Sequence, residues 1–183
     1  MIEVAKRLIN REEYYKMAEV GILKSSDHVE LINGEIIEMS PIGSRHAGAV
    51  RRMGRILTRY LNESVDISIQ SPIVLNDLSE PEPDIAILKF RADDYTESHP
   101  TAADIEYIIE VANTTLAYDL GVKSNLYAQA SIPIYWVVDL ERLEVTVYSN
   151  IFEGHYSKSE VLSTADEIEF LGSKISLSHL MIS

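Results

Sequence analysis

The chain contains no cysteine among its 183 residues. Disulfide bonds, thiolate metal sites and a cysteine nucleophile are therefore excluded. It also lacks the run of about 18 consecutive apolar residues that a membrane-spanning helix needs. The first residues contain no apolar core of a secretory signal, so we expect a cytoplasmic protein with no membrane partner. The composition is that of an ordinary globular protein, and the length favours a single domain over residues 1–183.

Several motifs of well-known enzyme classes are also missing. The sequence has no glycine-rich loop of the kinds that bind nucleotide phosphates. It has neither the G-x-S-x-G turn of serine hydrolases nor the H-E-x-x-H pair of zinc proteases. These absences exclude the commonest nucleotide-binding, serine-hydrolase and zinc-protease sites.

Positive charge is scarce, because 16 lysines and arginines stand against 29 acidic residues and give a formal charge of -13. Such a balance is unfavourable for binding nucleic acid, since cations on the protein drive contacts with phosphates. Five arginines nevertheless fall within one expected helix, and we interpret this stripe as a solvated face that offsets carboxylates elsewhere. The five are Arg45, Arg51, Arg52, Arg55 and Arg59.

Hydrophobic periodicity predicts an α/β (α+β) fold, with a mixed sheet flanked by helices and an N-terminal β-hairpin. Asn33-Gly34 between two alternating segments is a strong hairpin signal, and it places Glu30 on a largely apolar face. A helix before the strand at 133–139 permits a crossover to parallel pairing. The expected elements are helix 11–20, helix 45–63, strands 66–75, 83–88 and 104–112, helix 119–131, and strands 133–139 and 143–149.

Two carboxylates lie at the ends of neighbouring expected strands. Asp84 lies at the start of one strand, and Glu110 lies near the end of the next. If these strands pair antiparallel, the two residues meet at one sheet edge, roughly 5 Å apart. Like charges that close are stabilised by a hard divalent cation such as Mg²⁺, which prefers carboxylate oxygens. The alternative is two ordinary surface carboxylates at strand ends.

A lysine on the following helix strengthens the case for a catalytic site. Asp119, Lys123 and Tyr127 are spaced four residues apart, so in an α-helix they share one face. The ammonium of Lys123 can reach the two carboxylates, orient a water and balance charge on an attacked phosphate. The alternatives are a surface ion pair between Asp119 and Lys123, and a packing role for Tyr127.

Four segments in this order resemble the Uma-two family of restriction-endonuclease-like proteins. They are EPDIAIL, IIEVANTT, DLGVKSNLY and PIYWVVD. ELINGE, the helix that opens with His46, and Gln70 in IQSP fit the family as well, and the resemblance runs from about Glu12 to Leu180. It implies the PD-(D/E)XK nuclease superfamily with its αβββαβ core, which the expected element order contains.

The resemblance also assigns roles to particular residues. Asp84 matches the aspartate of the PD element, and Glu110 matches the second acid. Ala112 stands where the superfamily has its lysine, which implies that Lys123 takes that role from the helix. The expected site is therefore Asp84, Glu110 and the carbonyl of Val111 around Mg²⁺ (or Mn²⁺), with Lys123, Gln70, Glu30 and His46 nearby.

The resulting hypothesis is a Mg²⁺-dependent endonuclease that hydrolyses DNA and acts as a homodimer, since symmetric pairs are the commonest oligomers. His46 is either a structural histidine or, as the resemblance implies, an active-site contact. Two alternatives keep the fold. One is a nucleic-acid- or protein-binding module that has lost catalysis, and the other is a metal-dependent hydrolase of smaller phosphate esters.

Overall fold

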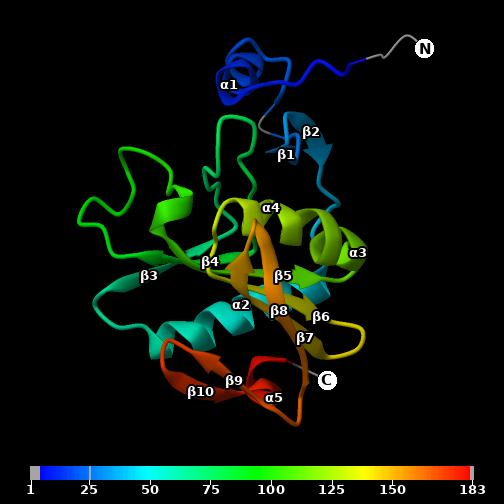
Figure 1. Ribbon diagram of the computed structural model, residues 1–183. Coiled ribbons are helices and arrows are strands. Elements are labelled where there is room, and N and C mark those ends of the chain that lie inside the picture. The colour runs from blue at the N-terminus through cyan, green and yellow to red at the C-terminus, as the bar shows by residue number, and fades with distance from the viewer. Residues whose placement is uncertain (1–4, 25, 182–183) are drawn as a thin grey trace.

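The computed structural model describes residues 5–24 and 26–181 (Figure 1). No helix in these two ranges is long and apolar enough to cross a membrane. Short 3₁₀ turns cover Thr58–Tyr60 and Ala102–Asp104, and a π-helical turn covers Asp119–Lys123. The remaining elements are α1 (Arg11–Glu19), β1 (Val29–Ile32), β2 (Glu35–Glu38), α2 (Ser44–Leu57), β3 (Val65–Ile69), β4 (Ile85–Lys89), β5 (Ile105–Ala112), α3 (Leu116–Tyr118), α4 (Ser124–Gln129), β6 (Ile134–Asp139), β7 (Glu144–Phe152), β8 (His155–Ser163), β9 (Glu167–Phe170), β10 (Ser173–Ser176) and α5 (Leu177–Leu180).

The centre of the molecule is a six-stranded mixed sheet in the order β3-β4-β5-β6-β7-β8 (Figure 1). Its strands pair antiparallel, except that β5 and β6 are parallel and are joined by the helical crossover of α3 and α4. The series α2, β3, β4, β5, α3–α4 and β6 is the predicted αβββαβ core. The fold class expected from the sequence is therefore confirmed.

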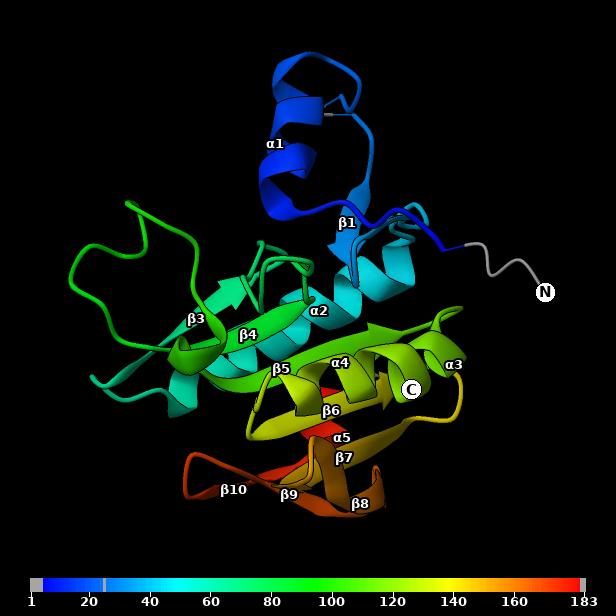
Figure 2. The same cartoon turned by 45° about the horizontal axis from the view of Figure 1, so that its top comes forward.

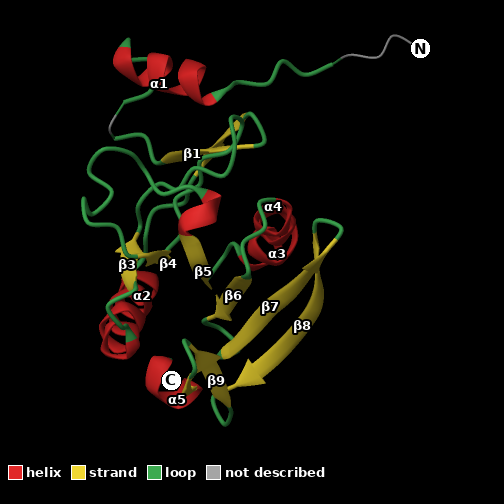
Figure 3. Ribbon diagram, turned by 60° about the vertical axis from the view of Figure 1, so that its left-hand side comes forward, coloured by secondary structure: helices red, strands yellow, loops and turns green. Residues whose placement is uncertain are grey.

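The sheet lies between two helical layers, and each layer covers its own buried cluster (Figures 2 and 3). One cluster contains α2, α5 and β9, packed on Ile109 and Val111 of β5. The other contains Tyr127 of α4, packed on Ile108 and Ala112. Successive residues of β5 point to opposite faces, which explains why its apolar run is continuous.

Helix α2 shows the pattern expected of a helix that packs on a sheet. Val50, Met53 and Leu57 recur at helical spacing and are buried against the sheet. Gly54 lies where a Cβ atom would come within 2.8 Å of Cδ1 of Ile69, so the helix approaches β3 closely. The first turn of α2 begins next to the end of the β1–β2 hairpin segment, at the sheet edge that carries the site.

The N-terminal hairpin forms as predicted, with Glu30 opposite Ile37. Asn33 and Gly34 both have positive φ, at 51° and 76°, as a two-residue type I′ turn requires. A Cβ on Gly34 would also lie 2.6 Å from Cβ of Leu8, so glycine is needed at this position for space as well as for conformation. The turn fixes the register that buries Glu30.

Several boundary predictions were wrong: the helix predicted at 45–63 ends at Leu57 before a 3₁₀ turn, and the strand predicted at 143–149 extends to Phe152. Two further errors fall beside the site. The strand predicted at 66–75 ends at Ile69, because Gln70 adopts a left-handed conformation with φ of 46°. The helix predicted at 119–131 begins already at Leu116 and contains the π-helical turn Asp119–Lys123. In both places the local pattern of apolar residues continues while the backbone departs from regular geometry.

Candidate active site

One cavity of about 650 Å³ opens at the sheet edge where β4 begins and β5 ends. The β1–β2 hairpin, the first turn of α2 and the π-helical turn line it together with this edge. Every side chain predicted for the site lies on its wall, as does the predicted metal ligand Val111. These lining residues are Glu30, His46, Gln70, Asp84, Glu110, Val111 and Lys123.

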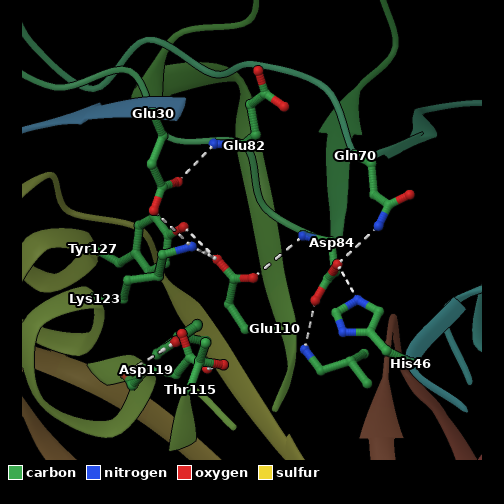
Figure 4. A network of polar contacts seen from close by, with 12 residues as sticks. Glu30, His46, Gln70, Glu82, Asp84, Glu110, Thr115, Asp119, Lys123 and Tyr127 are labelled. Carbon is green, nitrogen blue, oxygen red and sulfur yellow. Dashed lines mark hydrogen bonds and ion pairs between the residues drawn. The ribbon is translucent and has the colours of Figure 1, made fainter. Parts of the chain in front are cut away.

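Asp84 is a buried aspartate immediately before β4, surrounded by hydrogen-bond donors (Figure 4). Its Oδ1 accepts from Nε2 of His46 at 2.7 Å and from Nε2 of Gln70 at 3.2 Å. Its Oδ2 accepts from the backbone N–H of Val111 at 2.9 Å. Three segments distant in the sequence therefore hold this carboxylate at the cavity wall.

Glu110 lies beside Asp84, as the antiparallel pairing of β4 and β5 predicted. Its Oε2 accepts from the backbone N–H of Asp84 at 3.3 Å. Burial raises the pKa of Glu110 to about 8; the ammonium of Lys123 opposes this rise and the charge of Asp84 adds to it. A carboxyl whose pKa is raised by burial and by a neighbouring carboxylate in a cavity is typical of functional sites.

Lys123 supplies a positive charge at this point (Figure 4). Its Nζ lies 2.9 Å from Oε1 of Glu110 and 3.4 Å from Oε1 of Glu30, and its side chain is almost completely buried. Burial lowers the pKa of this ammonium, but the carboxylates of Glu110 and Glu30 outweigh burial and raise the pKa above its usual value. Lys123 is therefore a permanent cation that bridges the sheet edge and the hairpin.

The π-helical turn explains how Lys123 reaches the carboxylates. A π turn has more residues per turn than an α-helix, so Asp119 and Lys123 are not stacked as their spacing suggested. The carboxylate of Asp119 instead accepts from Oγ1 of Thr115 at 2.6 Å. The alternative of an Asp119–Lys123 surface ion pair is wrong, because both residues are buried and Lys123 pairs with Glu110 and Glu30.

Glu30 and Glu82 add two further carboxylates to the lining of the cavity (Figure 4). Glu30 is buried, and its Oε2 accepts from the backbone N–H of Glu82 at 3.2 Å. Glu82 is half-buried; burial raises the pKa of its carboxyl, and the charge of Glu30 adds to that rise. Sequence reasoning missed Glu82, although it lies two residues before Asp84 in the acidic connection.

His46, in the first turn of α2, lines the cavity, and its imidazole contacts Asp84. It is half-buried, and the hydrogen bond to Asp84 raises the pKa of its imidazole above the usual value, against the effect of burial. Gln70 reaches the same oxygen of Asp84 because its left-handed backbone turns the chain out of β3. Both residues orient Asp84.

Tyr127 is a further site residue that the sequence indicated only as a packing aromatic. Its hydroxyl donates to Oε1 of Glu110 at 2.8 Å, and the side chain is completely buried. The same oxygen of Glu110 therefore accepts from a cation and from a phenol. Tyr127 fixes the rotamer of Glu110, and the only sequence signal was its position one helical turn beyond Lys123.

Comparison with known proteins assigns the chain to a family. Residues 11–178 match the Uma2 family model, which is described as "Putative restriction endonuclease". The chain belongs to the Uma2 family. The resemblance seen in the sequence is thus confirmed over almost the same range that the four segments indicated. A search of the curated proteins found no match to the chain.

A solved structure shares the fold of this Uma2 member. It is described as a "putative nuclease belonging to DUF820", from Anabaena variabilis, and it matches with a TM-score of 0.72 at 14% identity. The match covers 94% of this chain and 97% of the other. At this low identity the likeness supports the fold, and the site rests on the geometry of this chain.

The position of Ala112 in this Uma2 chain accounts for the placement of the lysine. Ala112 and Glu110 alternate with Val111 along β5, so they point to the sheet face that α4 covers. Lys123 comes from the helical layer on that same face and reaches Glu110 there. An ammonium on the crossover helix thus occupies the region that a lysine at position 112 would enter from the strand.

Proposed function

We propose that the chain is an endonuclease that hydrolyses phosphodiester bonds in DNA with the help of a divalent cation, Mg²⁺ or Mn²⁺. One observation carries the proposal: Asp84, Glu110 and Lys123 converge from two strands and a crossover helix on one cavity. Family membership and the αβββαβ core support it. The arrangement provides two acidic groups and one cation at the point where a phosphate enters.

The donors at this edge fit a magnesium-type cation. Mg²⁺ usually binds one or two carboxylates and keeps waters and substrate phosphates as its other ligands. Among the described residues, Oδ2 of Asp84 and Oε2 of Glu110 each accept a single hydrogen bond, which leaves each an acceptor position for a cation. In the described part of the chain, no three histidines or acids are grouped to hold a metal by themselves. A cation bound by two carboxylates, the Val111 carbonyl and water is consistent with this donor set.

Each residue then has a definite task in hydrolysis. Asp84 and Glu110 would hold the cation, and when bound it would supply Lewis-acid chemistry to the phosphate and to a water. Asp84 and Glu110 provide its anionic ligands, and His46 and Gln70 keep Asp84 in place. Lys123 orients the attacking water and balances negative charge that develops on the phosphate. Glu30 holds the ammonium on the side away from Glu110.

The test is conversion of supercoiled plasmid to nicked and linear forms by the purified chain. We expect cleavage with Mg²⁺ or Mn²⁺ and none after chelation by EDTA, because Glu110 and Asp84 then lack the cation that activates the phosphate. Cleavage that persists unchanged in EDTA would contradict the metal-dependent mechanism. Cleavage of a small phosphodiester without cleavage of any DNA would favour the second candidate below.

The second candidate is a metal-dependent hydrolase of smaller phosphate esters. The formal charge of -13 favours it, since an acidic protein gains little from the many phosphates of a polymer. The cavity is also lined by Glu30 and Glu82 in addition to the two catalytic acids. The relative rates on plasmid and on bis(p-nitrophenyl) phosphate separate the two candidates.

We further propose that two copies of the chain associate through the edge strand β8. Residues 157–161 of this strand are exposed, and in antiparallel self-pairing about Ser159 each Lys158 faces Glu160 of the partner subunit. Opposite charges directly across a strand pair stabilise it, and lysine on an open edge discourages pairing with unrelated strands. A symmetric pair would carry two copies of the site.

Charge reversal tests this pairing. We expect light scattering to give the mass of a dimer for the wild type and of a monomer for Glu160→Lys, in which Lys158 faces lysine across the symmetry axis. The double variant Lys158→Glu with Glu160→Lys restores opposite charges and should restore the dimer. Equal masses for all three proteins would refute pairing through β8.

A further inference from the structure

The outer face of α2 carries arginines that the candidate site does not use. Arg51, Arg55 and Arg59 are exposed, and their side chains make no hydrogen bond to any described residue. They follow one another at intervals of four residues, which is about 6 Å along a helix. We call these three residues the arginine face.

The arginine face also lacks acidic partners. Among the described residues, nine of the sixteen lysines and arginines form ion pairs with carboxylates, and no arginine of α2 or of the following 3₁₀ turn is one of them. The expectation of a solvated helix face is confirmed for the three arginines of this face, which are exposed, although none of them forms an ion pair with a carboxylate of the described residues. The chain has a formal charge of -13, so three adjacent guanidinium groups without ion pairs form a local positive patch on a protein that is negative overall.

The position of α2 connects this face with the candidate site. His46, in the first turn of the helix, touches Asp84 and lines the cavity. Arg51 lies five residues further, or about 7.5 Å along the axis, and Arg55 lies about 13.5 Å along it. A surface hollow between Gly48, Arg51, Arg52 and Arg55 marks the start of the arginine face. The face thus runs outward from the end of the helix that reaches the cavity.

We infer that the arginine face binds the sugar–phosphate backbone of double-stranded DNA whose scissile phosphate occupies the cavity. This inference rests on the proposed function and names the surface that holds its substrate. Duplex DNA carries one negative charge per about 1.7 Å of its axis, so several phosphates lie within reach of a helix of this length. Arginine pairs with phosphate through two parallel hydrogen bonds, and no ion pair with a described carboxylate competes for these three guanidinium groups.

Binding of a 20-base-pair duplex by fluorescence anisotropy tests the inference in an Asp84→Asn background, where cleavage cannot interfere. We expect the triple variant Arg51→Gln, Arg55→Gln, Arg59→Gln to bind at least ten times more weakly, whatever the DNA sequence. The slope of log K against log salt should fall by about 3, because three phosphate contacts are lost. The variant with lysine at the same three positions should bind with an affinity between those of the wild type and the glutamine variant and keep the salt slope, because lysine retains the charge but not the paired hydrogen bonds.

A matched control removes three exposed cations elsewhere. Lys24→Gln, Lys89→Gln and Lys174→Gln change the net charge by the same amount, and we expect less than a twofold loss of binding. Equal losses in the two triple variants, or no loss in the arginine variant, would overturn the inference.

Activity measurements distinguish failure of this inference from failure of the proposed function. With Asp84 intact, the arginine variant should lose plasmid cleavage while its hydrolysis of bis(p-nitrophenyl) phosphate stays unchanged. Normal plasmid cleavage by the arginine variant would contradict DNA binding by the arginine face. It would still be consistent with the proposed nuclease activity. If the wild type cuts no DNA, weaker binding by the arginine variant alone would still support the surface.

Discussion

Replacement of Asp84 by asparagine should reduce plasmid cleavage by roughly 10³-fold or more, since a bound cation contributes several kcal/mol of transition-state stabilisation. The exchange removes one of two anionic ligands and keeps the size of the side chain. It also places an amide where Oδ1 and Oδ2 accept from His46, Gln70 and Val111. Initial rates on supercoiled plasmid at fixed Mg²⁺, with folding checked by circular dichroism, measure the effect.

A matched control for this variant is Asp94→Asn. Asp94 lies exposed in the loop after β4, and its backbone has φ of 48°, a conformation that asparagine tolerates. We expect cleavage by this protein to equal that of the wild type. If Asp84→Asn and the wild type nick plasmid equally, the activity comes from a contaminant or from another site.

Replacement of Lys123 by methionine should lower both cleavage and stability. Its ammonium lies between two buried carboxylates, and removing one partner of a buried ion pair costs about 3–5 kcal/mol, because the remaining charge is left uncompensated. We expect the free energy of unfolding in urea to fall by about that amount. Cleavage should fall roughly 10²-fold or more at a temperature where the variant stays folded, since the charge that balances the transition state is gone.

Lys89→Met is the control for the same chemical exchange. Lys89 is exposed at the end of β4, where it donates to the backbone oxygen of Ala103, so its loss should change stability by less than about 0.5 kcal/mol. A folded Lys123→Met protein that cleaves as fast as the wild type would remove Lys123 from the mechanism. The carboxylate pair would then have to act without it.

Much of the fold follows from local patterns in the sequence. The hairpin at Asn33-Gly34 needs a turn with two positive φ angles. Asn followed by Gly is the pair of residues that favours such a turn, so the sequence indicates it directly. The strands around Asp84 and Glu110 are short apolar segments, so their ends could be located and their antiparallel meeting inferred. The carboxylate pair was therefore predictable from strand ends.

The surroundings of that pair were less predictable. Gln70 stands where alternation predicts a strand, yet it turns out of the sheet to reach Asp84. Tyr127 packs in the core as its spacing predicted, and its hydroxyl also donates to Glu110. Glu82 looked like one acid among several in a polar connection, because burial beside Glu30 depends on how the hairpin lies over the sheet.

The sequence by itself determined the αβββαβ order, the family, and the two acids at adjacent strand ends, because each depends on contacts or patterns that are local in the chain. Only the tertiary structure decided that Lys123 pairs with Glu110 and Glu30, and that the arginines of α2 form no ion pair with a carboxylate in residues 5–24 or 26–181. The physical reason is that the pairing of a charged side chain depends on the groups that lie close to it in space. In this protein these groups come from segments far apart in the chain. The π-helical turn at Asp119–Lys123 adds to this, since it changes the direction of a side chain without changing the apolar pattern.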